Sequence, residues 1–345
     1  MALPLIGITM GDPTGVGPEI VLKALSSEAP YEFCRPVVLG DGGVLSCTAR
    51  ILGIHPAIEE ITQIPAEGYA PERIFVSSVS HLDAPALVFG RPDRQCGEAM
   101  ARYIEEGVRW IQQGKVQALT TCPINKQAIN VAGYPYSGHT EMLAHLSRVP
   151  STVMMFVGTR WKVVLVTTHV PLREVSAHIT SERLLTTVRL TAQGLKLHFG
   201  IPVPRMAILG LNPHCGEEGL LGVEEQNVIL PAMIQARSEG IEVEGPFPAD
   251  SFFHGTDHLS FDVVVSMYHD QGLIPIKMSE FSEAVNFTLG LPFIRTSVGH
   301  GTAYDIAGKG VADPTNLINA MAAASNILKL KLNHQEEVDK ETDLG

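Results

Sequence analysis

Short apolar runs alternate with helix-like segments along the whole chain, and this alternation limits the possible folds more than any other feature. The apolar runs have the pattern of buried strands; they span residues 5–9, 37–40, 74–77, 118–121, 152–157, 163–168, 206–211 and 263–266. The segments between them suit helices; they span residues 44–52, 98–113, 181–198, 224–237 and 314–330. Such alternation is typical of an α/β protein with a largely parallel or mixed sheet.

Length, charge and cysteine content narrow the class of protein. A chain of 345 residues is long enough for two domains or one large α/β domain. Its formal net charge of −12 disfavours non-specific binding to nucleic acid or to an anionic membrane. No apolar run approaches the ~20 residues of a membrane span, and the first residues lack the basic region of a signal peptide. Five cysteines without CxxC spacing favour free thiols, so we expect a soluble cytoplasmic protein.

Three histidines each follow an apolar run in a turn-rich setting. His169 ends Val-Leu-Val-Thr-Thr-His, His214 ends Leu-Gly-Leu-Asn-Pro-His, and His269 ends Val-Ser-Met-Tyr-His. Ligands of open α/β sheets bind at the carboxyl ends of the strands. Neutral imidazole suits zinc, cobalt, nickel or iron, and three protein ligands leave a position open for substrate. The trio is therefore a candidate catalytic metal site, with Asp270 as a candidate acceptor for a ligand ring. The alternative is that each histidine is an ordinary loop residue.

A glycine-rich segment, residues 299–314, precedes the last predicted helix. Glycine lets a backbone approach a ligand closely, and Asp305 lies near the centre of the segment. A carboxylate in such a loop can accept both ribose hydroxyls of a dinucleotide. The GxGxxG fingerprint is absent, and a long structural turn is the alternative.

Several cationic or polar side chains are candidates for holding the acidic groups of a substrate. Lys277, Asn286 and Arg295 lie in the second half of the chain, and His139 and Thr140 lie upstream in Gly-His-Thr-Glu. Lys and Arg bind phosphate and carboxylate groups, Arg in a bidentate manner. Arg295 follows an apolar run, which argues against simple surface exposure.

A series of short motifs covers the chain from residue 8 to about residue 330. They are Ile8-Thr9-Met10-Gly11-Asp12-Pro13, Thr121-Cys122-Pro123-Ile124-Asn125-Lys126, Ser137-Gly138-His139-Thr140-Glu141, Thr167-Thr168-His169-Val170-Pro171-Leu172, Leu211-Asn212-Pro213-His214, Pro248-Ala249-Asp250, Tyr268-His269-Asp270-Gln271-Gly272 and Val285-Asn286-Phe287-Thr288-Leu289-Gly290-Leu291-Pro292. Through these motifs, which occur in the same order, the chain resembles the 4-hydroxythreonine-4-phosphate dehydrogenase family of pyridoxal phosphate biosynthesis.

The resemblance implies roles for most of the candidate residues. It implies that one divalent metal ion (zinc, cobalt, manganese or magnesium) binds His169, His214 and His269. It implies a homodimer that shares this metal site across its interface, with His269 coming from the partner subunit. It also implies substrate-binding positions, which are His139, Thr140, Lys277, Asn286 and Arg295.

The family's fold is similar to that of the isocitrate and isopropylmalate dehydrogenases, with two α/β domains and a cleft between them. We expect a nucleotide-side domain at residues 1–130 plus 295–332, a metal- and dimer-side domain at 131–294, and an acidic flexible tail at 333–345. By analogy with the adenosine loop of those dehydrogenases, we expect NAD to bind at His300, Gly301, Thr302, Asp305 and Ile306. An acidic residue at 305 would repel a 2′-phosphate, which favours NAD over NADP.

The implied reaction is an NAD- and metal-dependent oxidation of 4-phosphohydroxythreonine at carbon 3. The β-keto acid product would decarboxylate to 3-amino-2-oxopropyl phosphate. Lys277, Asp250 and Asp270 are the candidates for the general base, and the sequence does not separate them.

Two alternatives stay open. Gly299 stands where many family members have Asp, which allows a related dehydrogenase acting on a phosphorylated sugar acid such as 4-phosphothreonate. From a different class, a mononuclear zinc hydrolase would also use three histidines and an activated water. The dinucleotide-like loop counts against the hydrolase.

Overall fold

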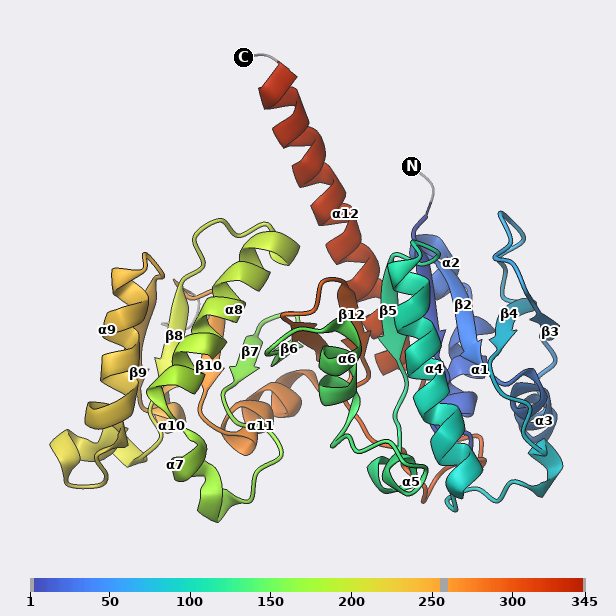
Figure 1. Ribbon diagram of the computed structural model, residues 1–345, viewed down its shortest axis with the longest axis horizontal. Helices are drawn as coiled ribbons and strands as arrows, with labels where there is room; N and C mark the ends of the chain where they lie inside the picture. The colour runs from blue at the N-terminus through green and yellow to red at the C-terminus, as the bar shows by residue number, and fades with distance from the viewer. Residues whose placement is uncertain (1–2, 255–259, 344–345) are drawn as a thin grey trace. The chain divides into compact units, whose positions relative to one another are not determined.

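The chain forms two compact α/β units (Figure 1). A computed structural model describes residues 3–254 and 260–343, with side chains described as far as residue 331. The first unit comprises residues 1–150 and 291–329, and the second comprises residues 151–290 and 330–345. The α/β class and the division into two units agree with the expectations from the sequence.

The first unit is built on a parallel sheet. In spatial order its strands are β3 (Ala57–Glu60), β4 (Arg73–Ser78), β2 (Arg35–Gly40), β1 (Leu5–Thr9), β5 (Ala118–Thr121) and β12 (Ile294–Ser297). Its helices are α1 (Gly17–Leu25), α2 (Ala29–Phe33), α3 (Gly42–Leu52), η1 (Ala84–Ala86), α4 (Arg94–Gln112), α5 (Lys126–Val131), α6 (His139–Ser147) and the first part of α12 (Thr315–Asp343). Every residue of β5 and β12 is buried, as is typical of parallel strands whose two faces are both covered.

Helix α6 belongs to the first unit, which corrects the predicted boundary. Met142 and Leu143 of α6 are fully buried in the same core as Leu119 of β5 and Ile104 and Trp110 of α4. Residues 131–150 were expected in the second domain. The burial of α6 against α4 and β5 explains why they join the first unit instead, and the other boundary falls at 290 rather than 294.

The second unit has a mixed sheet. In spatial order its strands are β11 (Val285–Leu289), β6 (Val153–Val157), β7 (Lys162–Leu165), β10 (Val263–Ser266), β8 (Met206–Leu209) and β9 (Val243–Phe247). Strand β6 is antiparallel to β11 and β7, whereas β7, β10, β8 and β9 run parallel. Its helices are η2 (Leu172–Glu174), α7 (Val175–His178), α8 (Ser181–Phe199), η3 (Pro213–Gly219), η4 (Glu225–Ile229), α9 (Leu230–Ser238), α10 (Ala249–Phe252) and α11 (His269–Glu280).

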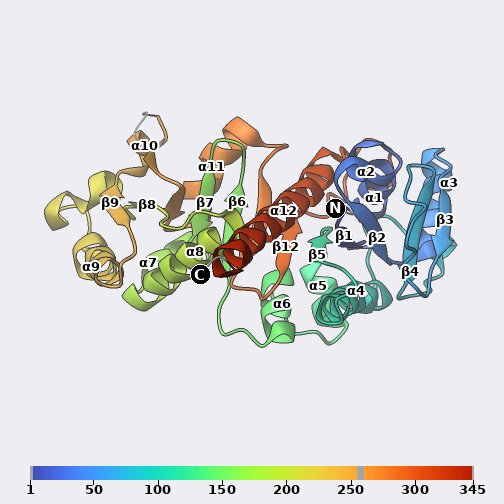
Figure 2. The same ribbon diagram turned by 90° about the horizontal axis from the view of Figure 1, so that it is seen from above.

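The C-terminal helix is longer than predicted. Helix α12 runs from Thr315 to Asp343 (Figure 2), although residues 333–345 were expected to form a flexible tail. The sequence after residue 330 contains no glycine or proline before Gly345, and its Lys, Gln and Glu residues are good helix formers. The helical pattern therefore continues to residue 343, and residues 344–345 lie outside the described part of the chain.

Candidate active site

Three neighbouring parallel strands of the second unit deliver the three candidate histidines to one edge of the sheet. Strand β10 pairs with β7 on one side and with β8 on the other, both in parallel. His169 follows β7, His269 follows β10 as the first residue of α11, and His214 follows β8. The backbone therefore brings all three to the carboxyl ends of adjacent strands, where α/β proteins bind ligands.

Two of these imidazoles lie together. The ring centroids of His169 and His269 are 6.0 Å apart and their planes are inclined by 41°. The Nδ1 atom of His269 lies 2.7 Å from Oδ1 of Asp270. A proton on Nδ1 donated to this carboxylate leaves the Nε2 lone pair free for a metal. Carboxylates that accept from the far ring nitrogen commonly orient metal-binding histidines in this way.

His214 occupies an unusual backbone conformation. From residue 214 to residue 218 the five φ angles lie between 41° and 81°, so that the chain makes a left-handed helical turn. Four of these residues are not glycine, and left-handed geometry costs roughly 1–2 kcal/mol for each such residue. The imidazole of His214 is exposed at this turn.

Buried Glu225 holds the start of this turn. Its Oε1 accepts the backbone N–H groups of Leu211 and Asn212 at 2.8 and 2.7 Å. Its Oε2 accepts from the Asn212 amide at 2.9 Å. The side-chain amide of Gln271 also donates to the Gly210 carbonyl at 2.6 Å and accepts from the backbone N–H of Met267. Gln271 thereby ties the segment before His214 to the segment before His269.

The residues of one chain fit part of a metal site. Two imidazoles and a supporting carboxylate are typical donors for zinc or cobalt. Among the side chains that the structure describes, however, no three from His, Cys, Asp and Glu converge closely enough to hold an ion. His214 therefore stands apart from the pair formed by His169 and His269, although sequence reasoning grouped all three.

Lys277 and Asn286, two further candidates, are related through Phe156 in the second unit. The ammonium of Lys277, on α11, lies 5.8 Å from the centroid of the Phe156 ring. Asn286 on β11 is the register partner of Phe156 on β6. Burial lowers the pKa of Lys277 from its ordinary value of 10.5. The Oδ1 atom of Asn286 is buried and has no hydrogen-bond partner among the described residues, so it is available to a ligand.

The other two candidates for the general base differ in their surroundings. Asp270 is exposed and engaged with His269. Asp250 lies in the first turn of the short helix α10. Lys277 is therefore the candidate whose environment most favours a neutral base, because burial disfavours its charged form.

A basic cluster in the first unit contains His139 and Arg295. Arg295 on β12 is 2% exposed and donates from Nη2 to Oγ1 of Thr121 at 2.6 Å. Burial lowers the pKa of this guanidinium to about 9, and the carboxylate of Glu141 opposes the shift. Arg295 is thus a buried cation, in agreement with the expectation that it is not a surface charge.

His139 is held neutral in this cluster. Burial lowers its pKa well below 6.5, and the nearby charges of Arg295 and Lys126 lower it further. Its buried Nε2 makes no hydrogen bond to any described residue. Thr140 follows it in the first turn of α6. Two buried polar groups and a surplus of positive charge make this cluster suitable for a phosphate or carboxylate.

The glycine-rich segment is anchored near its start by a buried carboxylate. Asp12, fully buried after β1, accepts from the backbone N–H and hydroxyl of Thr14, both at 2.8 Å. It also accepts from the phenol of Tyr304, which in turn accepts from the Asn125 amide at 2.7 Å. The carbonyl of Thr302 accepts from the backbone of Val16 at 3.0 Å. Burial raises the pKa of Asp12, and these hydrogen bonds oppose the rise.

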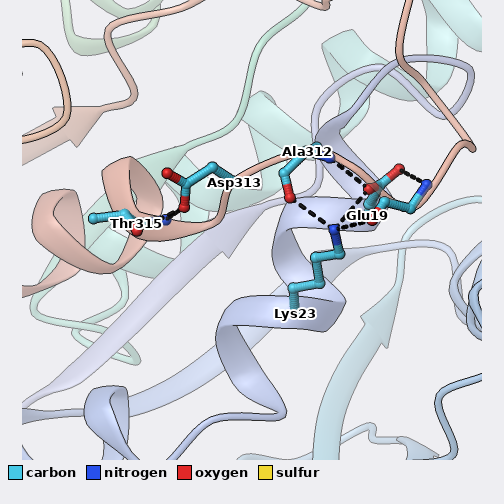
Figure 3. A network of polar contacts seen from close by, with 6 residues as sticks. Glu19, Lys23, Ala312, Asp313 and Thr315 are labelled. Carbon is cyan, nitrogen blue, oxygen red and sulfur yellow. Dashed lines mark hydrogen bonds and ion pairs between the residues drawn. The ribbon is translucent and has the colours of Figure 1, made fainter.

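A second anchor fixes the far end of the segment, as Figure 3 shows. The buried carboxylate of Glu19 on α1 accepts from the backbone N–H of Ala312 at 2.9 Å and forms an ion pair with Lys23 at 3.0 Å. The ammonium of Lys23 donates to the carbonyls of Gly310 and Ala312 at 2.7 and 2.8 Å. Each polar group of the pair therefore bonds the loop backbone directly.

The five residues predicted to bind a nucleotide are open to solvent to some degree. Gly301 and Asp305 are exposed, and His300 and Ile306 are partly exposed. The Nδ1 atom of His300 lies 2.9 Å from the carbonyl of Gly301. Of the five residues predicted to bind a nucleotide, Thr302 uses its carbonyl internally, and the other four have side chains or backbone accessible to a ligand.

Sequence reasoning did not assign roles to Asp12, Glu19, Lys23 or Glu225. Asp12 was quoted only within a motif. The available signal was acidic residues next to strand ends or in first helical turns, which by itself also fits ordinary caps.

Comparison with known proteins matches this architecture over nearly the whole chain. A 4-hydroxythreonine-4-phosphate dehydrogenase from Desulforapulum autotrophicum is 51% identical over 325 residues, covering 93% of this chain and 95% of the relative. A D-threonate 4-phosphate dehydrogenase from Cupriavidus necator is 41% identical, covering 94% of this chain and 97% of the relative. The crystal structure of 4-hydroxythreonine-4-phosphate dehydrogenase from Klebsiella pneumoniae superposes with a TM-score of 0.85 at 38% identity, covering 94% and 99% of the two chains.

These matches place the chain in a class of α/β dehydrogenases. Residues 32–324 match the sequence profile of the family described as pyridoxal phosphate biosynthetic protein PdxA. The chain therefore belongs to the PdxA family. No helix within the described residues is both long and apolar enough to cross a membrane.

Proposed function

We propose that this protein catalyses the NAD- and divalent-metal-dependent oxidation of 4-phosphohydroxythreonine at carbon 3, in pyridoxal phosphate biosynthesis. The observation that carries the proposal is the nearly full-length match, at 51% identity, to a relative named for this substrate. The relative named for D-threonate 4-phosphate is less similar, at 41% identity.

The basic cluster of the first unit supplies the groups that an acidic substrate needs. Arg295 provides a buried positive charge, and the neutral His139 provides an unpartnered ring nitrogen. Thr140 adds a hydroxyl nearby in sequence. We propose that these residues bind phosphate or carboxylate oxygens of the substrate, and that Lys277 and Asn286 are substrate-binding residues as well.

We propose that the exposed part of residues 299–314 binds NAD, with Asp305 accepting the ribose hydroxyls. Bound NAD would accept the hydride from carbon 3. The anchors at Tyr304 and at Glu19–Lys23 support this role because they fix both ends of the loop and leave Asp305 exposed. A carboxylate at this position would disfavour the 2′-phosphate of NADP.

We propose that His169, His214 and His269 bind the metal. A divalent ion there would lower the pKa of the substrate hydroxyl and polarise the developing carbonyl. Lys277, half-buried and with a lowered pKa, would accept the hydroxyl proton. The β-keto acid would then lose carbon dioxide to give 3-amino-2-oxopropyl phosphate.

We propose that the protein is a homodimer that shares this site. Helix α11, which begins at His269, presents Ile274, Met278 and Phe281 to solvent with exposures of 56%, 84% and 69%. Their spacing puts them on one helix face, and an exposed apolar stripe of this kind marks a contact surface. The resemblance implies that the second copy supplies His269. Because His169 and His269 lie together in one chain, we propose that the second copy supplies His214. The five unpaired cysteines fit a reducing compartment such as the cytoplasm.

The test is NADH formation by the purified, metal-supplemented protein with 4-phosphohydroxythreonine and 4-phosphothreonate assayed side by side. Faster turnover of the amino acid is expected. Preference for 4-phosphothreonate would assign the protein to the sugar-acid dehydrogenases, and absence of NADH with both would refute the dehydrogenase proposal.

A Gly299→Asp variant tests whether residue 299 sets the choice of substrate, and it should be assayed in parallel. The backbone N–H of Gly299 donates to the Asn316 side chain at 2.6 Å, and this bond does not depend on the side chain at 299. An unchanged ratio of the two kcat/KM values would make Gly299 neutral for specificity.

A further inference from the structure

We propose that Glu225 is a positioning residue for the metal site, acting through the left-handed turn that carries His214. The proposal rests on the metal-binding role of His214 proposed above. It assigns a function to a buried carboxylate that has no part in the reaction itself.

The turn needs an external restraint because its own sequence does not favour it. His214, Cys215, Glu217 and Glu218 adopt φ angles of 51°, 55°, 41° and 56°, a region that L-residues other than Gly and Asn rarely occupy. Only Gly216 is suited to it. Residues held in such conformations persist when the surrounding structure over-determines them, and they cluster at functional sites.

Glu225 provides that restraint. It is 2% exposed, and its two oxygens accept three hydrogen bonds from the residues that lead into the turn, Leu211 and Asn212. A Cβ atom at Gly216 would lie 2.9 Å from Oε2 of Glu225 and 2.7 Å from the Gly222 carbonyl, so the turn closes directly over the carboxylate. Glu225 also begins η4, a π-helical turn, which is a feature frequent at functional sites.

Further hydrogen bonds join the segment before His214 to the segments that follow His169 and His269. Asn212 donates a further bond to Glu224, which accepts from the Ser176 hydroxyl on the segment after His169. Gln271, two residues after His269, donates to the Gly210 carbonyl. Glu225 is thus the buried member of a set of bonds that fixes the His214 backbone relative to the ends of β7 and β10.

The restraint by Glu225 matters for metal binding because the imidazole of His214 is exposed. Its position is set by the backbone, since neighbouring side chains leave the ring exposed. Loosening the turn would spread the ring over several positions and weaken any metal that it binds. Outer-shell groups that orient a ligand typically contribute about 10- to 100-fold to metal affinity.

The test is titration of the full-length, metal-free protein with Co²⁺, followed by calorimetry and by the visible absorption of the bound ion. Glu225→Gln keeps the size of the side chain and one acceptor oxygen. Its amide would place a donor against the Asn212 amide, which also donates. We expect Co²⁺ affinity to fall about 10- to 100-fold and the absorption spectrum to change. The matched control is Glu218→Gln, an exposed residue of the same turn, which should bind Co²⁺ like the wild type.

The outcomes separate this inference from the function on which it rests. Wild-type affinity and spectrum in a folded Glu225→Gln variant would overturn the positioning role. If that variant does not fold, Asn212→Asp places a third carboxylate beside Glu224 and Glu225, and unchanged Co²⁺ binding by it would overturn the role equally. Failure of the wild type to bind Co²⁺, or wild-type binding by His214→Ala, would instead refute the proposed metal site.

Discussion

His169 and His269 lie with their ring centroids 6.0 Å apart in a single chain, at the ends of the paired strands β7 and β10. His214 is not part of a three-residue cluster with them among the described side chains. In a site shared between two copies, this pair would be combined with His214 from the second copy. That division predicts which inactive variants can restore one another.

We expect coexpressed His169→Ala and His214→Ala chains to recover activity, although each variant alone is inactive. A mixed dimer would contain one intact site, so random pairing would give about a quarter of the wild-type activity. The pair His169→Ala with His269→Ala should recover none, because both changes remove ligands from the same chain. Recovery by that second pair would mean that His269, not His214, is supplied across the interface.

The stability of the protein should depend on pH through His198. Burial, together with the charge of Lys331, lowers the pKa of His198 to about 4 in the folded state. The unfolded chain binds this proton near pH 6.5, so stability is lost as the pH falls from about 6.5 towards 4. Its Nδ1 has no hydrogen-bond partner among the described residues, and its ring packs edge-on against Phe287.

A His198→Leu variant should therefore lose less in Tm between pH 6.5 and pH 4 than the wild type, as measured by calorimetry at both pH values. His178→Leu is the control, because His178 is exposed. Equal slopes for the wild type and His198→Leu would show that other groups set the acid sensitivity.

The exposed carboxylate of Asp305 should contribute to the binding of NAD and not to the binding of the phosphorylated substrate. We expect Asp305→Ala to raise the KM for NAD about tenfold or more while changing the KM of the phosphorylated substrate little, because a uniform binding contact to one ligand is removed. The Tm should stay within a few degrees, since the side chain is exposed. Glu98→Ala, an exposed acidic residue on α4, serves as a control. Equal increases in both KM values would contradict the ribose role.

The pair formed by Glu19 and Lys23 should keep residues 299–314 ordered. Lys23→Met removes two hydrogen bonds to the Gly310 and Ala312 carbonyls and leaves the buried Glu19 without its cation. We expect faster amide hydrogen exchange in residues 309–313 and a lower Tm. Lys115→Met, on the surface beside Trp110, is the control. Unchanged exchange in the loop would show that the other anchor, at Asp12 and Tyr304, is sufficient.

The sequence predicted most of the buried strands, and it predicted that the three histidines follow strands whose carboxyl ends share one edge of the sheet. Buried parallel strands such as Ala118–Thr121 and Val263–Ser266 can be recognised in the sequence because both of their faces are covered, which leaves them without charged residues. Strand β3, Ala57–Glu60, was not predicted because its residues are partly or fully exposed at the sheet edge. Helix α11 was not predicted either, since Pro275 interrupts its pattern.

The supports of the candidate site were beyond sequence reasoning for a different reason. The turn at His214 contains one glycine in five residues, so no local preference predicts a left-handed path. It is fixed by Glu225, which comes later in the chain, and the glycine-rich segment is fixed by Asp12 and Glu19, almost 300 residues earlier in the sequence. Local patterns carry little information about such distant bonds.

The hydroxyls of Thr120 and Thr296 bond each other across 176 residues of sequence, because residues 151–290 of the second unit lie between β5 and β12 in the chain. During synthesis on the ribosome, the sheet of the first unit therefore cannot be completed until β12 has been made. Residues 151–290, by contrast, form a continuous stretch that emerges complete before β12 is made. We expect these inserted residues, which carry all the strands of the second unit, to fold before β12 is available. The edge of β5 then stays open during much of translation, and a chaperone would be needed at that edge.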